Sequence, residues 1–195
     1  MAKFITLNEA KMACKLVDEE KYDGWLDTLI KGYTASIQQW LHRDIISDTY
    51  TEYHDIKYKQ VAIFLKQYPV TSIAGATSHG TAVVEGTDYN SYYDKGMLRK
   101  KPTDNIDVIN YIKDYWYEGD KEFEITYTAG YASTAIPDAI KLATMKLVRR
   151  DFYDSGVDDI RTRKAGEDYY TRYDLTDGMP PGIYTLLHPF RRQFK

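Results

Sequence analysis

The stretch FEITYTAGYASTAIPDAIKLATMKLVRRDFY, residues 123–153, changes from a strand pattern to a helix pattern across one short join. In its first part apolar and polar residues alternate, which places Phe123, Ile125, Tyr127 and Ala129 on one face of a strand. After Pro137 the apolar residues recur every three or four positions, which is the period of a helix. Proline suits a first helical turn because its missing N–H would have no partner there. The stretch therefore predicts an α+β fold in which a strand ends at Gly130 and a helix covers residues 137–154.

Two more helices are predicted nearer the N-terminus. Thr6-Leu7-Asn8-Glu9 matches a capping box, in which Thr6 and Glu9 satisfy each other's backbone N–H groups, and it predicts a helix over residues 4–17. A longer helix over residues 22–42 is predicted from an apolar stripe at helical spacing. The stripe consists of Trp25, Leu26, Leu29, Ile30, Tyr33, Ile37, Trp40 and Leu41. Together with the helix over 137–154, these segments predict a small bundle of three to four helices.

Residues 48–131 are predicted to be a β-rich insertion in this bundle. They are rich in Tyr, Thr, Ile and Val, and their apolar period is near two in places. Pro69 is expected in an edge strand or at the start of a strand, because proline cannot donate to a ladder. Asp94-Lys95-Gly96 is expected to be a hairpin turn. Residues 1–156 are thus predicted to form one domain of mixed α+β structure.

Residues 157–195 are predicted to form an extended C-terminal tail. They mix charges, tyrosines and Pro-Pro-Gly with little period, apart from a short helix expected near residues 158–168. Such a segment is often disordered, or ordered only on a partner. Its end, HPFRRQFK, alternates aromatic and cationic residues, which suits an anchor in an acidic or carbonyl-rich pocket of another protein. The candidate docking residues are Tyr184, His188, Phe190, Arg191, Arg192, Phe194 and Lys195. A solvated tail and a contact with a nucleic-acid backbone are the alternatives for the same residues.

Composition and charge argue against several classes of protein. The chain has 195 residues, a net charge of -3 and a pI of about 5.8, which gives no overall attraction to DNA or to an anionic membrane. We expect no membrane partner, because the apolar runs are too short to cross a bilayer. With a single cysteine, Cys14, the chain cannot form an internal disulfide, which fits synthesis in a reducing cytoplasm.

Motifs that carry chemistry are not found in the sequence. The four histidines, His42, His54, His79 and His188, lack the spacing of a zinc site. The sequence contains no phosphate loop, dinucleotide fingerprint or nucleophile elbow. Cys14 lies on the apolar face of its predicted helix, where a core residue is expected and not an activated thiolate. We therefore expect a protein without catalytic residues, metal or cofactor.

Five segments in a fixed order carry a resemblance that covers residues 4–155. They are ITLNEAK, IQQWLHRDI, QYPVTSIAGAT, FEITYTAGY and IPDAIKLATMKLVRRDFY. In this order the chain resembles the head–tail connector proteins of tailed bacteriophages, also called head-completion or adaptor proteins. The long β-rich middle and the long segment after Asp154 depart from the shorter members, which puts the subunit contacts in question.

The resemblance implies a structural protein of the virion neck, made in the host cytoplasm. Such proteins form a ring beneath the portal, commonly of twelve subunits. The ring extends the DNA channel and provides a docking surface for the stopper or the tail. The implied partners are further copies of the chain, the portal protein, and a stopper or tail-completion protein. DNA is expected to pass through without specific binding. By position alone, residues after about 169 are implied to reach the portal.

Two alternative functions remain open at the level of the sequence. The first is a phage tail-completion protein, or another interaction protein of the neck or tail, with a similar α+β build. The second is a small nucleic-acid-binding module, suggested by the 19 tyrosines and the basic C-terminal end. Binding to portal or tail proteins would separate the first alternative from a connector, and salt-dependent DNA binding would support the second.

Overall fold

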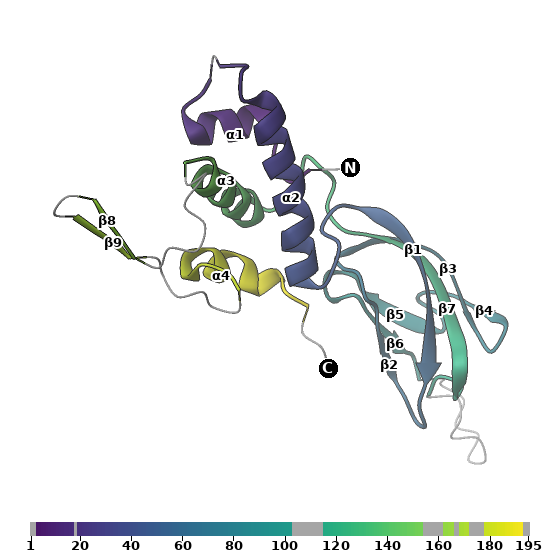
Figure 1. Cartoon of the computed structure of the whole chain (residues 1–195). Coiled ribbons are helices and arrows are strands. Elements are labelled where there is room, and N and C mark those ends of the chain that lie inside the picture. Colours follow the sequence, from purple (N-terminus) through teal and green to yellow (C-terminus); the bar gives the residue numbers. More distant parts are fainter. Residues whose placement is uncertain are drawn as a thin grey trace, which may run out of the picture. The chain divides into compact units, whose positions relative to one another are not determined.

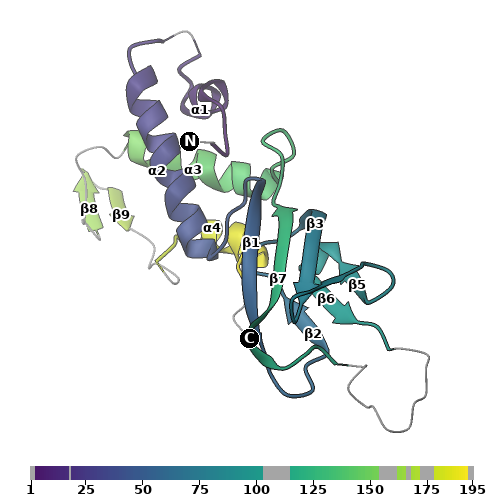
Figure 2. The same cartoon turned by 90° about the vertical axis from the view of Figure 1, so that its right-hand side faces the viewer.

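The computed structural model describes residues 3–17, 19–102, 115–153, 162–165, 168–171 and 178–192. The chain divides into two compact units, which can be followed in Figures 1 and 2. A helical unit comprises residues 1–43 and 133–195, and a β-rich unit comprises residues 44–132. The predicted α+β class, with a β-rich insertion in a helical bundle, is confirmed. The units differ from the predicted segments 1–156 and 157–195, because the helical unit draws on both.

The helical unit is built around α3 (Asp138–Tyr153), which contacts α1 (Leu7–Cys14), α2 (Asp23–Leu41) and α4 (Pro181–Leu187). A 3₁₀ helix, η3 (His188–Phe190), follows α4 directly. The buried face of α3 carries Ile140, Ala143, Thr144, Leu147 and Val148, as the helical period predicts. Within the described ranges, no helix combines the length and the apolar character that a membrane crossing requires.

The first helix is shorter than predicted at both ends. The capping box is confirmed, since Thr6 is the N-cap and its hydroxyl accepts from the backbone N–H of Glu9 at 3.2 Å. The helix therefore starts at Leu7 and not at residue 4. It ends at Cys14 because Lys15 adopts the left-handed conformation, with φ of 58°. Val17, which the predicted helix 4–17 includes, is 58% exposed.

Most of the predicted stripe on α2 packs into the core of the helical unit. Leu26, Ile30, Ile37 and Leu41 are fully buried, whereas Trp25 is 48% exposed. The helix ends at Leu41 because His42 adopts a left-handed conformation. The buried face of α2 also includes one polar residue outside the stripe, Thr34, whose hydroxyl donates to the carbonyl of Ile30 at 2.8 Å. Leu26 and Ile30 share a core with residues of α1 and α3, namely Ala10, Cys14 and Val148.

Two antiparallel sheets form the β-rich unit, and Figure 2 shows both. The larger sheet has the order β1-β7-β3-β4, from β1 (Asp48–Ile56), β7 (Gly119–Ala129), β3 (Val70–Ser78) and β4 (Thr81–Val83). The smaller has the order β2-β6-β5, from β2 (Ala62–Phe64), β6 (Met97–Lys100) and β5 (Tyr89–Tyr92). One hydrophobic core contains residues of both sheets, including Ile63, Leu98, Phe123 and Ile125. The two sheets therefore stabilise each other by burying their inner faces together.

Strand β7 confirms the predicted alternation of apolar and polar residues along residues 123–129. Phe123, Ile125, Tyr127 and Ala129 are fully buried, and the residues between them are half-buried. The predicted turn at residues 94–96 is also confirmed, because it joins β5 to β6 through a 3₁₀ turn, η1 (Tyr93–Lys95), and a left-handed Gly96. Pro69 directly precedes β3, so it marks the start of a strand. The edge-strand alternative is wrong, because β3 lies between β7 and β4.

The two ends of the β-rich unit lie side by side. Ile46 and Tyr131 form a parallel bridge, and the Ser47 N–H donates to the Tyr131 carbonyl at 2.9 Å. Gly130, between this bridge and the end of β7, has a positive φ of 106°. A Cβ built there would lie 2.8 Å from the carbonyl carbon of Ile46, so the backbones approach as closely as they do only because residue 130 is glycine.

A buried carboxylate, Glu52 of β1, is held within the β-rich unit. The Tyr127 hydroxyl donates to it, and the backbone N–H of Lys66 donates to its two oxygens at 3.1 and 3.2 Å. The Nε2 of His54 lies 3.0 Å from Oε2. Burial by itself raises the pKa of Glu52, but the contacts with His54 and Tyr127 outweigh it and hold the pKa below its usual value. Residue Glu52 therefore links β1, β7 and the segment after β2 as a charged acceptor.

The C-terminal extension differs from the sequence prediction in two places. Instead of the short helix expected near residues 158–168, residues 162–165 form β8 (Thr162–Ala165), which pairs with β9 (Asp168–Thr171). Thr162 in β8, and Tyr169, Tyr170 and Thr171 in β9, are residue types that favour strands, which explains why the helix prediction is wrong there. The irregular structure expected farther on is also wrong for residues 181–190, which form α4 and η3.

A candidate docking surface on the helical unit

Helix α4 is short, and its sequence explains both its start and its orientation. Pro181 occupies the first turn, where the missing N–H of proline costs no intrahelical bond. Ile183 and Leu187 are four residues apart and therefore share one face, and both are buried. This face packs α4 against α3. The opposite face, with the exposed Gly182 and Thr185, is directed to solvent.

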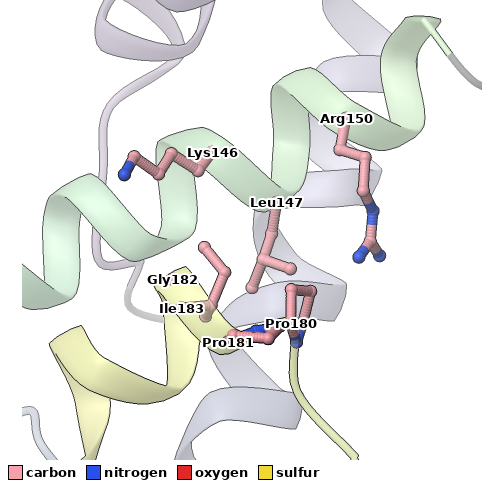
Figure 3. Close-up of a pocket in the computed structure, with 7 residues that line it drawn as sticks. All are labelled: Lys146, Leu147, Arg150, Pro180, Pro181, Gly182 and Ile183. Carbon is pink, nitrogen blue, oxygen red and sulfur yellow. The ribbon is translucent and has the colours of Figure 1, made fainter. Parts of the chain in front are cut away.

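A groove of about 390 Å³ lies between α3 and the start of α4 (Figure 3). Its apolar part is formed by Leu147 of α3 and by Pro180, Pro181 and Ile183. Figure 3 shows the side chains of Leu147 and Ile183 pointing toward each other beneath the two cations of α3, Lys146 and Arg150. The groove thus combines an apolar floor with a basic rim.

Arg150 is fixed in place by neighbours on α2 and α3. Its Nε donates to Asp151 at 3.0 Å, and its Nη2 lies 3.5 Å from the Tyr33 hydroxyl. The Tyr33 hydroxyl in turn donates to Asp151. Burial and the contact with Asp151 raise the pKa of Tyr33 to about 12, so the phenol stays protonated at neutral pH. Asp151 compensates part of the charge of Arg150. Arg150 therefore contributes a side chain in a fixed orientation to the rim of the groove, and little free positive charge.

Lys146 supplies the second positive charge at the rim. It is exposed, and no ion pair of Lys146 is found among the residues the structure describes. A cation beside an apolar floor suits a partner segment that inserts an apolar side chain and carries a carboxylate or carbonyl close by. Contacts of this kind are typical of protein docking, in which an anchor fills a pocket and a charge at the rim orients it.

A second cluster, which we call the Trp40 cluster, joins the end of α2 to the C-terminal residues. The Trp40 ring packs edge-on against Tyr184 with ring centroids 5.7 Å apart, and the Arg191 guanidinium lies 4.5 Å from the Trp40 ring centroid. The Arg192 N–H donates to the carbonyl of Leu41 at 3.0 Å. This carbonyl belongs to the last turn of α2, where backbone acceptors lack intrahelical partners. The C-terminal residues therefore cap α2 and stack on its last aromatic side chain.

The family model described as "Head completion protein" matches residues 3–193. The chain belongs to the head completion protein family. A search of the curated proteins found no match.

Solved structures share the fold of this head completion protein over nearly its entire length. The neck of an empty gene transfer agent particle, computed with C6 symmetry, contains a chain that matches with a TM-score of 0.59 and 16% identity. The match covers 98% of this chain and 91% of that chain. A native gene transfer agent virion gives the same values. The neck of a native particle computed with C12 symmetry matches with a TM-score of 0.54 and 14% identity, over 100% of this chain and 97% of that one.

The structure brings some of the predicted docking residues of this head completion protein together. Tyr184, His188 and Arg191 gather near Trp40, with the Tyr184 and His188 rings 5.0 Å apart. Phe190 is half-buried, and Arg192 is held through its backbone. Phe194 and Lys195 lie outside the described residues. Whether any of these side chains docks on a partner stays a prediction.

Sequence reasoning missed the groove and the role of Trp40. A signal for the groove was present, since Pro-Pro-Gly followed by apolar residues four apart is typical of a short helix packed by one face. Trp40 was assigned to the apolar stripe of α2, and its contact with Arg191, 151 residues later, has no local signal. Cys14 is fully buried, as expected for a core residue, and burial raises the pKa of its thiol. Among the described residues, no group of three or more His, Cys, Asp and Glu could hold a metal ion.

Replacing Trp40 with alanine is expected to release the C-terminal residues from α2. The variant loses an aromatic pair, a cation–π contact and buried area, which together cost about 2–3 kcal/mol. Amide hydrogen exchange at Arg192 should accelerate, because its N–H bonds to the Leu41 carbonyl only while the segment is seated. The exposed Trp25 offers a matched control, and Trp25→Ala should leave that exchange rate unchanged. Equal protection at Arg192 in both variants would contradict the role of Trp40 in holding the C-terminal residues on α2.

Proposed function

We propose that this chain is a head–tail connector, a structural protein of the virion neck that forms a ring under the portal. The observation that carries this proposal is the family match, which covers residues 3–193 and therefore both units. The fold similarity to chains of gene transfer agent necks and virions supports it, because those matches also cover nearly the full length of each chain.

A ring of twelve subunits is proposed for the assembled state. Two of the similar structures come from necks computed with C6 and C12 symmetry. In a closed ring each subunit presents one surface to the neighbour on one side and a different surface to the other. A chain with two compact units offers such distinct surfaces on a single molecule. The ring would extend the DNA channel and give the stopper or the tail a surface to bind.

The proposed work of the chain is contact and geometry, without a chemical reaction. DNA would pass through the ring without specific binding, and a net charge of -3 limits attraction between the protein and the phosphates. The groove between α3 and α4 is the proposed docking surface for the portal or the stopper, because its apolar floor and the exposed cation of Lys146 suit an anchoring segment.

Reconstitution with purified portal tests this function. The full-length chain and portal should form a complex that negative-stain images show as a ring stacked on the portal. Lys146→Glu should weaken the complex if the groove docks the portal, while Arg149→Glu, an equal charge reversal elsewhere on α3, should not. Absence of any complex between the wild-type chain and portal or neck proteins would overturn the proposed function. Equal binding by both variants would remove only the groove from the portal contact.

A further inference from the structure

Strand β1 ends the larger sheet of the β-rich unit. Among the described strands it pairs with β7 alone, so one of its two edges has no strand beside it along nine residues. On this strand the backbone N–H of Thr49 donates to the side chain of its own neighbour, Asp48, at 2.8 Å. A long edge of this kind is a template for another strand, and natural proteins usually cover or block it.

The hairpin of β8 and β9 could supply the neighbouring strand that the free edge of β1 lacks in the residues that the structure describes. The two strands pair with each other from Thr162↔Thr171 to Ala165↔Asp168 and form a two-stranded sheet within the described part of the chain. A two-stranded hairpin is at best marginally stable in water, and a third strand supplies the support that it lacks. Among the strands that the structure describes, the helical unit thus carries a short sheet with unpaired edges, and the β-rich unit carries a long unpaired edge on β1.

Charge favours pairing between these two elements. The sequence of β8 contains Arg163 and Lys164 and no acid, whereas β1 begins with Asp48 and has an exposed Asp55 near its end. Opposite charges on neighbouring strands stabilise a pair, and like charges oppose it. An approach of β8 to β1 is therefore favoured over an approach of β1 to the β1 edge of another copy, where Asp48 and Asp55 would meet further acids.

We propose that the β8–β9 hairpin of one copy adds to the β1 edge of a second copy and extends its sheet from four strands to six. The inference rests on the proposed ring. Donor and acceptor lie in different units of the chain, so the contact is heterologous and repeats from subunit to subunit until the ring closes. Backbone hydrogen bonds along the edge supply affinity, as in other cases of strand addition.

Cysteine cross-linking on the full-length chain tests this contact. Thr51→Cys on β1 and Lys164→Cys on β8 are combined in one chain, assembled with portal, oxidised mildly, and analysed by denaturing electrophoresis without reductant. The native Cys14 is fully buried and does not compete. In parallel experiments the cysteines are placed at Thr49 on β1 or at Arg163 on β8. These positions detect the contact even if the strands pair with a register shifted by two residues on β1 or by one residue on β8. The expected result is a shift from the one-chain band to a ladder of multi-chain bands.

The control places the acceptor cysteine on the opposite edge of the same sheet. Thr81→Cys on β4 with Lys164→Cys should leave the chain in the one-chain band. A disulfide within one chain, detected as a one-chain band of altered mobility, would show that the hairpin pairs with its own β1 edge and would overturn the inference. Rings on the portal without any cross-link would overturn it as well, while leaving the proposed function standing. Failure of every variant and of the wild type to assemble would instead count against the proposed function and, with it, this contact.

Discussion

Replacing Gly130 with alanine is expected to destabilise the β-rich unit by about 2–5 kcal/mol, a large part of the stability of an ordinary domain. Residue 130 has φ of 106°, a region that disfavours any side chain by about 1–2 kcal/mol. The new Cβ would also lie within 2.9 Å of the Ile46 carbonyl and the Ser47 Cα. Backbone atoms cannot turn aside as a side chain can, so the strand end has to shift, at a further cost of about 1–3 kcal/mol.

The shift would affect several hydrogen bonds at once. The Gly130 N–H donates to the Pro69 carbonyl at 2.9 Å, and the Tyr131 N–H donates to the Ile45 carbonyl at 2.8 Å. Urea unfolding followed by circular dichroism measures the loss. Gly80→Ala is the matched control, because Gly80 also has a positive φ, 70°, but open space where the Cβ would lie. The control variant should lose only the free energy that a side chain costs at a positive φ, about 1–2 kcal/mol. Equal losses in the two variants would show that the close approach at Gly130 contributes nothing.

The second large effect is expected for Glu52→Ala. The substitution leaves the Tyr127 hydroxyl and the Lys66 N–H without their acceptor in a region from which water is largely excluded. Removing one partner from a buried polar group of this kind costs about 3–5 kcal/mol. The adjacent strand pair offers a matched control, because Glu124 also accepts from a tyrosine hydroxyl, that of Tyr53, but at an exposed site. Glu124→Ala should cost less than about 1 kcal/mol in the same unfolding experiment.

The same carboxylate makes stability depend on pH, with a sign that follows from its lowered pKa. Because the pKa of Glu52 in the folded chain lies below the ordinary value of 4.5, the ionised form binds its neighbours more strongly than the protonated form does. This contribution is fully present above pH 4.5 and is lost as the pH falls through the folded-state pKa. Unfolding free energies measured below pH 4.5 should therefore fall less steeply for Glu52→Gln than for the wild-type chain. A parallel pH profile of the two would show that Glu52 is not the group responsible.

Local patterns predicted those elements in which local rules and tertiary packing agree. The alternation along β7, the capping box at Thr6 and the stripe on α3 all appear where the sequence places them. Helix ends were less predictable, because Lys15 and His42 stop their helices in left-handed conformations without a glycine. A non-glycine residue in that conformation has little local signature.

The interactions that sequence reasoning missed connect residues far apart in the chain. Glu52 and Tyr127 are 75 residues apart, and neither looks unusual in an alternating strand. Helix α4 has a local signal, Pro-Pro-Gly followed by Ile183 and Leu187 four residues apart, but that signal does not show which element the helix packs against. The groove exists only once α4 packs on α3, so its residues could not be grouped beforehand. Periodicity describes each element separately, and the candidate surface arises from their assembly.

Because Ile46 and Tyr131 form a parallel bridge, the chain enters and leaves the β-rich unit at adjacent points. A chain segment with adjacent ends can lengthen, shorten or be exchanged for another without pulling apart the frame into which it is inserted, because closure entropy grows only slowly with length. Residues 44–132 can also complete their own hydrogen bonds while the ribosome still holds residues 133–195, which the helical unit needs. During synthesis, the β-rich unit would thus fold before the helical unit, whose residues lie on both sides of it in the sequence.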